Sequence, residues 1–353
     1  MKKYDKEVIQ VALSDEEKVI KALTKNYVKA LAKVKEKIKM IMLEAEETQL
    51  QSKVYQLHYQ QLIEKQLSEC LKILQEGNIK TVTEYLNKCY ENGFVGNMYS
   101  LNQQGIPLVL PIEQKQVIQS VMKPTESFTF SERLYDNISE LKTVVKSELS
   151  RGLASQMTYA DIARNISNYT QIDLNKSIRI ARTEGHRVQN ESRLDAMQAA
   201  KKKGADIVKQ WDSTLDGKTR PNHRLLDGQV KELDEPFEVS GMKVNAPGAF
   251  GIAAEDCNCR CCLLQRAKWK TKIDETKYIG RLENMTDEQL LPTAMRLNIS
   301  VDELRKTTKG DTIIPERAKN FEDFKTKYNK IWHYEGSNLQ KEVEARIASY
   351  KKK

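Results

Sequence analysis

The sequence predicts a mainly α-helical protein with a small α+β domain, in which long N-terminal helices precede a compact α+β unit and a helical C-terminal appendage. Two observations favour this class. No glycine or proline precedes Gly77, and apolar residues recur there at intervals of three or four. Beyond Gly204 the pattern changes to short, strand-like runs.

The N-terminal segment reads as helix from a capping box at Ser14-Asp15-Glu16-Glu17. The apolar stripe behind it comprises Ile20, Leu23, Tyr27, Leu31, Val34, Ile38, Ile41 and Ala45, and it resumes with Tyr59, Leu62, Leu67, Leu71 and Leu74. One very long helix and a helical hairpin fit this pattern equally well.

Residues 77–130 contain seven breakers that predict turns around short helices: Gly77, Gly93, Gly96, Gly105, Pro107, Pro111 and Pro124. Further helices are expected from Ser131 to about Arg151, from Thr158 with Asp161 completing its cap, and from about Asp173 to Lys203, where Gly204 ends the last one.

Three later segments have strand-like content: residues 206–214, 229–239 and 242–245, with Ser240-Gly241 turning the last two into a hairpin. The predicted division is therefore a long-helix and loop region (1–130), a domain of helices 131–203 plus the α+β unit 204–265, and a polar, mostly helical appendage (266–353).

The composition bounds the function only loosely. The chain has 353 residues, with 58 basic against 49 acidic ones and a net charge of +9. A mixed, solvated surface explains this excess better than a dedicated polyanion-binding face. No apolar run is long enough to span a membrane, and the first residues lack the apolar core of a signal peptide, so synthesis and retention in the cytoplasm are expected.

A series of polar residues between Ala181 and Cys261 resembles the Mu F-like head-morphogenesis family of phages. Order and spacing carry the resemblance, and the residues are Arg182, Thr183, Glu184, Arg187, Asn190, Trp211, Asp216, Thr219, Arg220, His223, Asp227, Gly228 and Arg260, the last within Asn258-Cys259-Arg260-Cys261. One departure stands out, since family members often have His-Pro before that last element where this chain has Asp256-Cys257.

The resemblance implies a minor head protein, present in few copies at or near the portal vertex, that helps to build the procapsid and travels with the DNA. The implied partners are the portal protein, the scaffold or the major capsid protein, and double-stranded DNA. The implied locations are the host cytoplasm during assembly and then the virion head. It implies no catalytic residues, so a non-enzymatic role is expected.

The predicted helix 173–203 has two distinct sides. Small residues (Ala181, Gly185, Val188, Ser192 and Ala199) form a packing face, and Arg179, Arg182, His186, Gln189 and Arg193 form a cationic ridge beside it. The polar rows either fix the helix to the α+β unit through hydrogen bonds, which is favoured, or form a ridge that binds phosphates or a partner. The candidate nucleic-acid-binding residues are Arg179, Arg193, Lys201, Lys202, Lys203, Arg266, Lys268 and Lys270, with Trp269 among the last of them.

The turn at Asp216-Gly217 precedes Thr219, Arg220 and His223 on a short expected helix. A buried structural network of Asp216, Arg220 and His223 is favoured over a phosphate-binding or acid–base cluster, because no nucleophile or paired carboxylate stands beside it.

Four of the six cysteines lie between Cys257 and Cys262, a pattern unlike a secreted disulfide framework. On a strand, the thiols of Cys257, Cys259 and Cys261 would share one face, and with His223 they could bind zinc. Neighbouring thiols on one strand face lie about 6.5–7 Å apart, which is wide for one ion, so buried reduced thiols are favoured over zinc.

Three functions remain open: a structural head protein that docks through its long helices and contacts DNA electrostatically, a metal-dependent nuclease or toxin-like transferase centred on His223 and the cysteines, and a non-catalytic nucleic-acid-binding module. The first is favoured.

Overall fold

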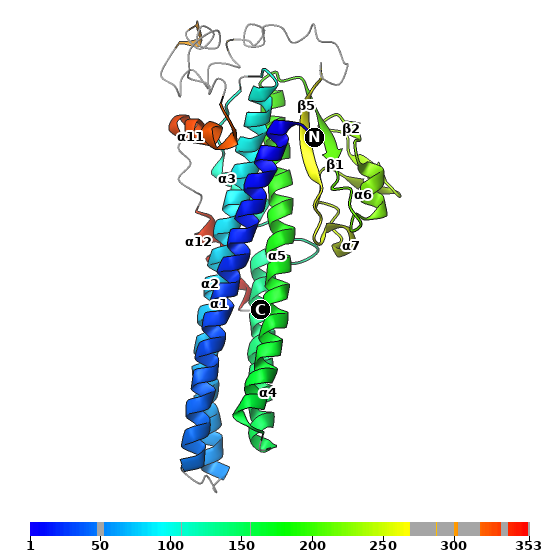
Figure 1. Ribbon diagram of the computed structural model, residues 1–353. Coiled ribbons are helices and arrows are strands. Elements are labelled where there is room, and N and C mark those ends of the chain that lie inside the picture. Colours follow the sequence, from blue (N-terminus) through cyan, green and yellow to red (C-terminus); the bar gives the residue numbers. More distant parts are fainter. Residues whose placement is uncertain are drawn as a thin grey trace. The chain divides into compact units, whose positions relative to one another are not determined.

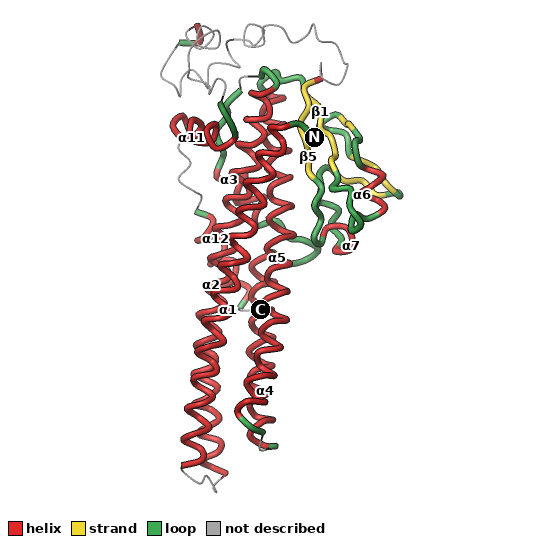
Figure 2. The backbone as a smooth tube through the Cα atoms, viewed as in Figure 1, coloured by secondary structure: helices red, strands yellow, loops and turns green. Residues whose placement is uncertain are grey.

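The computed structural model describes residues 1–47, 53–106, 108–155, 157–268, 287, 300–302, 318–332 and 338–351. Helices dominate, and the strands are few and short (Figure 2). The predicted fold class, mainly α with a small α+β region, is confirmed. Two helices of the C-terminal part lie within the described residues, α11 (Phe321–Ile331) and α12 (Leu339–Tyr350).

The chain forms two compact units, each made of segments that are distant in sequence. Unit 1 comprises residues 1–15, 86–126 and 183–339, and unit 2 comprises residues 16–85, 127–182 and 340–353. Three of the five limits between them fall inside the longest helices, α1 (Lys3–Glu47), α2 (Lys53–Gln103) and α5 (Tyr159–Lys202), labelled in Figure 1. The sequence-based limits at 130 and 265 remain predictions.

Unit 2 is helical, built from parts of α1, α2 and α5 together with α4 (Phe130–Ala154) and α12. The predicted stripe forms its core, in which Leu23, Tyr27, Val34 and Ile38 are buried. The Tyr27 hydroxyl donates to Asp173 Oδ2 at 2.6 Å and lies 2.8 Å from Ser177 Oγ. Burial raises the pKa of Asp173 to about 6, although the Tyr27 hydrogen bond opposes the shift.

Of the two alternatives for the N-terminal segment, the hairpin is correct. α1 ends at Glu47 and α2 begins at Lys53. Asn26 Nδ2 of α1 lies 3.3 Å from both Asn78 Oδ1 and Thr81 Oγ1 of α2, so the two helices run side by side. The start of α1 was predicted wrongly, because the helix begins at Lys3 and Asp15 instead accepts a hydrogen bond from Asn92 within unit 1.

The glycines of α2 were also misinterpreted. Gly77, Gly93 and Gly96 were expected at turns, but all three lie inside this helix. A Cβ atom on Gly93 would stand 1.9 Å from Ser192 Oγ and 2.4 Å from the Gln189 carbonyl oxygen, and one on Gly96 would stand 2.5 Å from Val8 Cγ1. In unit 1 these two glycines therefore permit close helix approach and do not break the helix.

The two helices predicted to begin at Thr158 and near Asp173 are one helix, α5. Thr158 caps its start, with its Oγ1 accepting from Asp161 N–H at 3.2 Å, as expected. α5 then continues to Lys202 without the second start predicted near Asp173, because the apolar spacing persists through Ile162, Ile166 and Leu174, all buried. Gly204, at φ +88°, ends it as predicted.

The α+β part of unit 1 holds a three-stranded antiparallel sheet in the order β2-β1-β5, formed by β1 (Ile207–Asp212), β2 (Val230–Lys231) and β5 (Cys262–Ala267). A separate hairpin joins β3 (Phe237–Val239) to β4 (Met242–Val244). Its turn residues Ser240 and Gly241 have φ +50° and +79°, which confirms the predicted turn.

The predicted single strand 229–239 is wrong, because β2 and β3 belong to different sheets. Asp234-Glu235-Pro236 lies between them, and proline cannot donate to a strand ladder. Strand β5 was not predicted at all. Three short helices complete the described part of unit 1 up to residue 268: α3 (Gln114–Val121), α6 (Pro221–Leu226) and α7 (Ala253–Asp256).

No membrane-spanning candidate occurs among the helices of the described residues, since none combines sufficient length with sufficient apolarity.

The close approach at Gly93 predicts the sign of a substitution. In an exposed helix, Gly→Ala stabilises by about 1 kcal/mol. Gly93→Ala should instead destabilise unit 1 by about 1–3 kcal/mol, because the new methyl group meets backbone at 2.4 Å. Urea unfolding of Gly93→Ala and of Gly217→Ala, where no atom lies within 4 Å of the new Cβ, provides the comparison. Stabilisation by Gly93→Ala would contradict the packing.

Candidate functional site

The edge of β5 that does not face β1 is bonded to the helices of unit 1. β5 pairs with β1 on one side only, so the backbone groups of Leu263, Gln265 and Ala267 point away from that ladder. Asn190 on α5 meets this edge with both ends of its amide. Its Oδ1 accepts from Leu263 N–H at 2.9 Å, and its Nδ2 donates to the Cys261 carbonyl at 3.1 Å. One side chain thereby satisfies two buried backbone groups.

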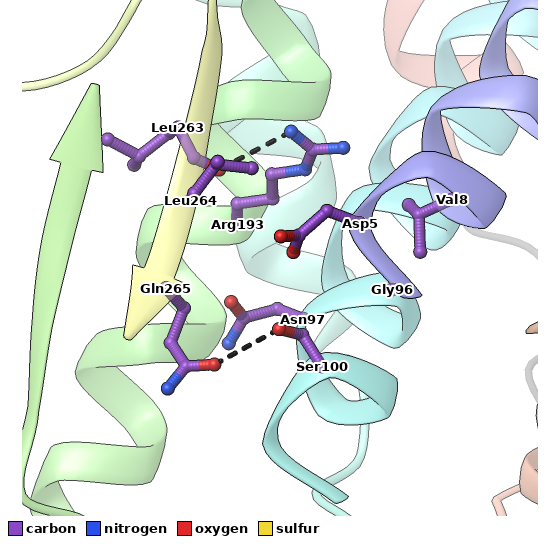
Figure 3. Close-up of a pocket in the computed structure, with 9 residues that line it drawn as sticks. All are labelled: Asp5, Val8, Gly96, Asn97, Ser100, Arg193, Leu263, Leu264 and Gln265. Atoms are coloured by element: carbon purple, nitrogen blue, oxygen red, sulfur yellow. Dashed lines mark hydrogen bonds between the residues drawn. The ribbon is translucent and has the colours of Figure 1, made fainter. Parts of the chain in front are cut away.

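Gln104, at the end of helix α2, makes further hydrogen bonds to the same edge of β5. Its Oε1 accepts from Ala267 N–H at 3.0 Å, and its Nε2 donates to Gln265 Oε1 at 2.8 Å. Figure 3 shows the neighbouring part of the contact between β5 and the two helices. There Ser100 donates to Gln265, and Arg193 donates to the Leu263 carbonyl at 3.3 Å. Polar side chains of two helices therefore close the free edge of the sheet.

The polar rows of α5 had two alternatives, and the favoured one, attachment of the helix to the α+β unit, agrees with the contacts of His186 and Arg193. His186, Gln189 and Arg193 are buried or half-buried in unit 1, and Arg193 is 5% exposed. His186 Nε2 contacts the Cys261 carbonyl. Burial, the largest contribution, lowers the pKa of His186 to about 4, so its ring is neutral near pH 7. His186 and Arg193 therefore contact backbone carbonyls at the β5 edge.

The other nucleic-acid candidates differ in their availability. Arg266 is buried, with NH2 3.0 Å from Asp5 Oδ2, and Lys268 pairs with Asp206 at 3.0 Å and with Glu232 at 2.8 Å. Lys201 pairs with Asp234 at 3.3 Å.

The exposed candidates are Arg179 in unit 2 and Lys201 and Lys202 in unit 1, with Lys203 half-buried. Lys270 and Trp269 lie outside the described residues. The structure thus leaves few of the expected basic residues open to a phosphate.

A buried charge network follows on the next face of α5. Arg187 contacts Glu184 at 2.8 Å and Glu191 at 2.7 Å, and its NH2 donates to the Ser120 carbonyl at 3.0 Å. Thr125 donates to the other oxygen of Glu184 at 2.9 Å. Burial alone would lower the pKa of Arg187, but the two carboxylates raise it. The network ties the segment after α3 to α5.

Two further motif residues of α5 have identified partners. Thr183 Oγ1 accepts from Asn258 N–H at 3.2 Å and so fixes the turn before β5. Arg182, in unit 2, is exposed and lies 2.8 Å from Glu16.

The turn after β1 separates residues that were expected to interact. Asp216 pairs with Arg260 through both oxygens, one of the two contacts measuring 2.8 Å, and Arg260 lowers the pKa of Asp216. Arg220 instead donates to the carbonyls of Glu255 at 3.1 Å and Cys257 at 2.7 Å. Thr219 Oγ1 donates to the Thr214 carbonyl. The predicted network of Asp216, Arg220 and His223 is therefore wrong, because each of the first two has a different partner.

Trp211 of β1 packs against His223 of α6. It is fully buried, with its ring 5.9 Å from His223 and 5.3 Å from Phe237, and its Nε1 donates to Ser213 Oγ at 3.1 Å. Asp227 accepts from Ser213 N–H at 2.7 Å. The N–H of Gly228 donates to the Trp211 carbonyl at 2.9 Å. Gly228 has φ +76°, a backbone conformation that favours glycine.

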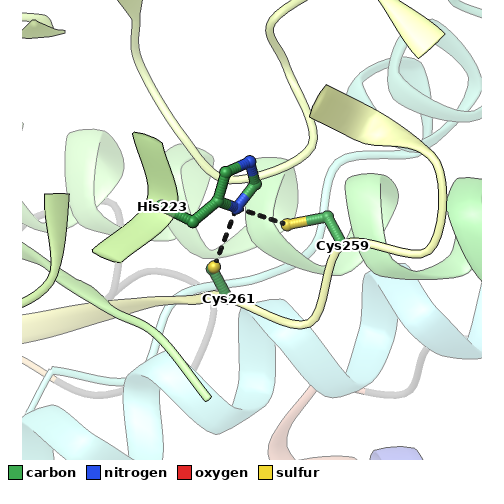
Figure 4. Close-up of side chains that lie close together, drawn as sticks. All are labelled: His223, Cys259 and Cys261. Atoms are coloured by element: carbon green, nitrogen blue, oxygen red, sulfur yellow. Dashed lines mark hydrogen bonds between the residues drawn. The ribbon is translucent and has the colours of Figure 1, made fainter. Parts of the chain in front are cut away.

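His223, Cys259 and Cys261 converge in the interior of unit 1 (Figure 4). His223 Nδ1 lies 3.1 Å from Cys261 Sγ and 3.6 Å from Cys259 Sγ. The expected strand at 257–261 is wrong, because Asn258 has φ +53° and Cys259 N–H returns to the Asp256 carbonyl at 3.2 Å. This turn draws together thiols that a strand would separate. Cys257 lies outside the group.

The cluster is electrostatically asymmetric. The hydrogen bond from Cys259, followed by that from His223, lowers the pKa of Cys261 although burial opposes the shift. The same thiol–thiol hydrogen bond and burial raise the pKa of Cys259. Burial would lower the pKa of His223, but Cys261 and Glu255 together raise it.

Sequence reasoning missed several residues of this region. Glu255 Oε2 lies 3.0 Å from His223 Nε2, and Asp256 accepts from the N–H groups of Phe250 at 3.0 Å and Gly251 at 2.7 Å. Gln104 and Ser120 are in segments that carried no recognised motif. The carboxylates beside the cysteines were a visible signal, whereas nothing local in sequence marked Gln104.

The part of the chain that contains this site is similar to known proteins. The family model described as Phage Mu protein F like protein matches residues 143–264, which include the end of α4, all of α5 and the sheet region. The minor head protein GP7 of Bacillus phage SPP1 is 34% identical over 211 residues, covering 57% of this chain and 67% of that protein. The chain belongs to the phage Mu F-like minor head protein family. No solved structure matches it.

A second relative carries an enzyme name. The protein called NAD(+)–arginine ADP-ribosyltransferase EFV, from Enterococcus faecalis, is 30% identical over 269 residues, covering 75% of this chain. The match spans only 55% of that protein, so the chain spans about half of this relative's length. The family places the protein among the components of phage heads.

Removal of the buried Arg187 guanidinium should lower the free energy of unfolding. Arg187→Met leaves Glu184, which is fully buried, without its cation and should destabilise the fold by about 3–5 kcal/mol. The double variant Arg187→Met/Glu184→Gln should recover part of that loss, as measured by urea unfolding.

Arg164→Met is the matched control, because Arg164 forms an exposed pair with Asp161 at 3.2 Å and should change stability by less than about 1 kcal/mol. Equal losses in the single and double variants would contradict the role assigned to the buried pair.

Proposed function

We propose that the protein acts in procapsid assembly and in DNA packaging or delivery, docking at the portal vertex of the phage head. The observation that supports a shape-holding role is the engagement of Thr183, Glu184, Arg187 and Asn190 by partners within unit 1, where each is buried. Side chains that bond within unit 1 hold its shape. The outward faces of the protein then contact the partner.

The long helices offer faces for such a partner. Val28 on α1 and Ile73 on α2 are apolar side chains of unit 2 that are 61% and 53% exposed. Exposed apolar residues on helices are suited to contact with a second protein, and the portal protein is the partner that the family implies. Scaffold and major capsid protein are the alternative partners.

Co-purification with the portal protein encoded by the same phage genome tests this role. The full chain should form a defined complex with the portal in size-exclusion chromatography. Val28→Asp and Ile73→Asp should weaken it, because a buried charge opposes an apolar contact. Leu225→Asp, at a 66% exposed position on α6 of unit 1, is the matched control and should leave the complex intact. A chain that binds neither portal, scaffold nor capsid protein would refute the assembly role.

The proposal includes electrostatic contact with double-stranded DNA, supported by the net charge of +9 and by exposed residues such as Arg179 and Lys202. Affinity measured by fluorescence anisotropy should fall steeply with salt and ignore sequence. Lys202→Ala should reduce the salt slope by about 1, as expected for one lost phosphate contact. Lys3→Ala, which removes the same charge at an exposed position outside the candidate set, should leave the slope unchanged. Salt-independent binding would exclude this component.

A metal-dependent nuclease or toxin-like transferase is the second candidate function, favoured by the convergence of His223 with two thiols. It requires a measurable turnover that disappears in His223→Ala. The transferase name belongs to the Enterococcus relative, of which 45% lies outside the matched region.

A further inference from the structure

The turn before β5 and helix α6 bring three donor atoms to one point. Cys259 and Cys261 are separated by a single residue, and the left-handed Asn258 together with the Asp256 carbonyl curls the chain so that both sulfur atoms face His223. Imidazole nitrogen and two thiolate sulfurs are a donor set that zinc prefers. All three ligand atoms lie within 4.8 Å of one another.

The distances fit a single ion. With metal–sulfur bonds of about 2.3 Å and a metal–nitrogen bond of about 2.0 Å, a tetrahedral centre places nitrogen and sulfur about 3.5 Å apart. The observed separations from His223 Nδ1 are 3.6 Å to Cys259 and 3.1 Å to Cys261. Insertion of an ion would require only a small outward movement of the Cys261 thiol.

The far side of the imidazole ring has the partner that metal-bound histidines use. His223 Nε2 lies 3.0 Å from Glu255 Oε2, yet neither atom makes a well-directed hydrogen bond within the described residues. A proton on Nε2, on the side of the ring near this carboxylate, would leave the lone pair of Nδ1 free for a cation. Asn222 holds the other carboxylate oxygen at 2.8 Å, which orients Glu255.

A fourth coordination position is available. A cavity of about 20 Å³, lined by His223, Cys259 and Cys261 together with Thr219 and Arg220, adjoins the three donors. This volume accommodates one water molecule. A catalytic triad of Cys261, His223 and Glu255 is the competing arrangement, but it assigns no role to Cys259, whose thiol approaches the same nitrogen.

We propose that unit 1 binds one zinc ion through His223 Nδ1, Cys259 Sγ and Cys261 Sγ, with a water molecule as fourth ligand and Glu255 as the positioning residue behind the imidazole. Both thiols release their protons to solvent as the two Zn–S bonds form, and no redox step occurs. The ion joins α6 to the turn that precedes β5.

Metal analysis of the tag-free full chain, purified in a phosphine reductant without chelator, tests the site. We expect about one zinc per chain, and less than a tenth of that in His223→Gln, Cys259→Ser and Cys261→Ser. Cys257→Ser, which alters a neighbouring thiol outside the group, should retain the zinc. Glu255→Gln should weaken zinc affinity about 10–100-fold in a competition with a chelating dye.

A spectroscopic measurement on the unaltered protein guards against variants that fail to fold. Cobalt exchanged into the chain should give the intense visible bands of tetrahedral coordination and the near-ultraviolet sulfur-to-cobalt charge-transfer band. Wild-type protein that holds no zinc and shows no such bands would overturn the proposal. So would a zinc content that survives Cys259→Ser and Cys261→Ser together in folded protein. Because these outcomes do not depend on portal binding, they are distinct from a failure of the assembly role.

Discussion

The free edge of β5 is the constraint on which unit 1 depends. A strand paired on one side leaves backbone donors and acceptors on the other, and each one buried without a partner costs about 1–3 kcal/mol. Water cannot serve these groups because α5 and α2 cover them. Asn190, Arg193 and Gln104 serve them instead, each from a fixed position on a long helix. The register of the strand against the helices is thus set by side-chain hydrogen bonds.

This arrangement requires the helices to approach closely. Gly93 of α2 faces Ser192 of α5, where the two backbones leave no space for a Cβ atom, and Gly96 receives Val8 of α1 in the same way. An alanine at Gly93 would push α2 away from α5 and with it the amide of Gln104 from the end of β5. Glycine in a helix lowers its intrinsic stability by about 1 kcal/mol, and the packing that it permits offsets this loss.

The sequence was a good guide wherever period and local chemistry determined the structure. The stripe around Leu23 and Tyr27, the cap at Thr158 and the turn at Ser240-Gly241 follow from interactions within a few residues, and each is present. Gly93 and Gly96 were misleading because a glycine that permits packing has the same local signature as one that breaks a helix. Only the partner helix distinguishes the two cases.

The basic residues of α5 left two alternatives open for a similar reason. Helical spacing correctly put His186 and Arg193 on one side of the helix, but it carries no information on whether that side faces solvent or a strand. The carbonyls of Cys261 and Leu263, about seventy positions later in the chain, provide the acceptors that bury them. For the cysteines, the period-two assumption failed because Asn258 adopts a left-handed conformation that residue identity alone only weakly favours.

Cys261 links the two parts of the site. Its carbonyl accepts from Asn190 and so belongs to the closed edge, and its sulfur lies 3.1 Å from His223 and so belongs to the thiol–imidazole cluster. The position of this one residue is therefore fixed from both directions, by α5 through its backbone and by α6 through its side chain. A family motif spread over about eighty residues has a simple physical meaning here. Thr183, Asn190, Arg220 and His223 converge on the turn before β5. Their spacing in sequence reflects the helix and strands that lie between them.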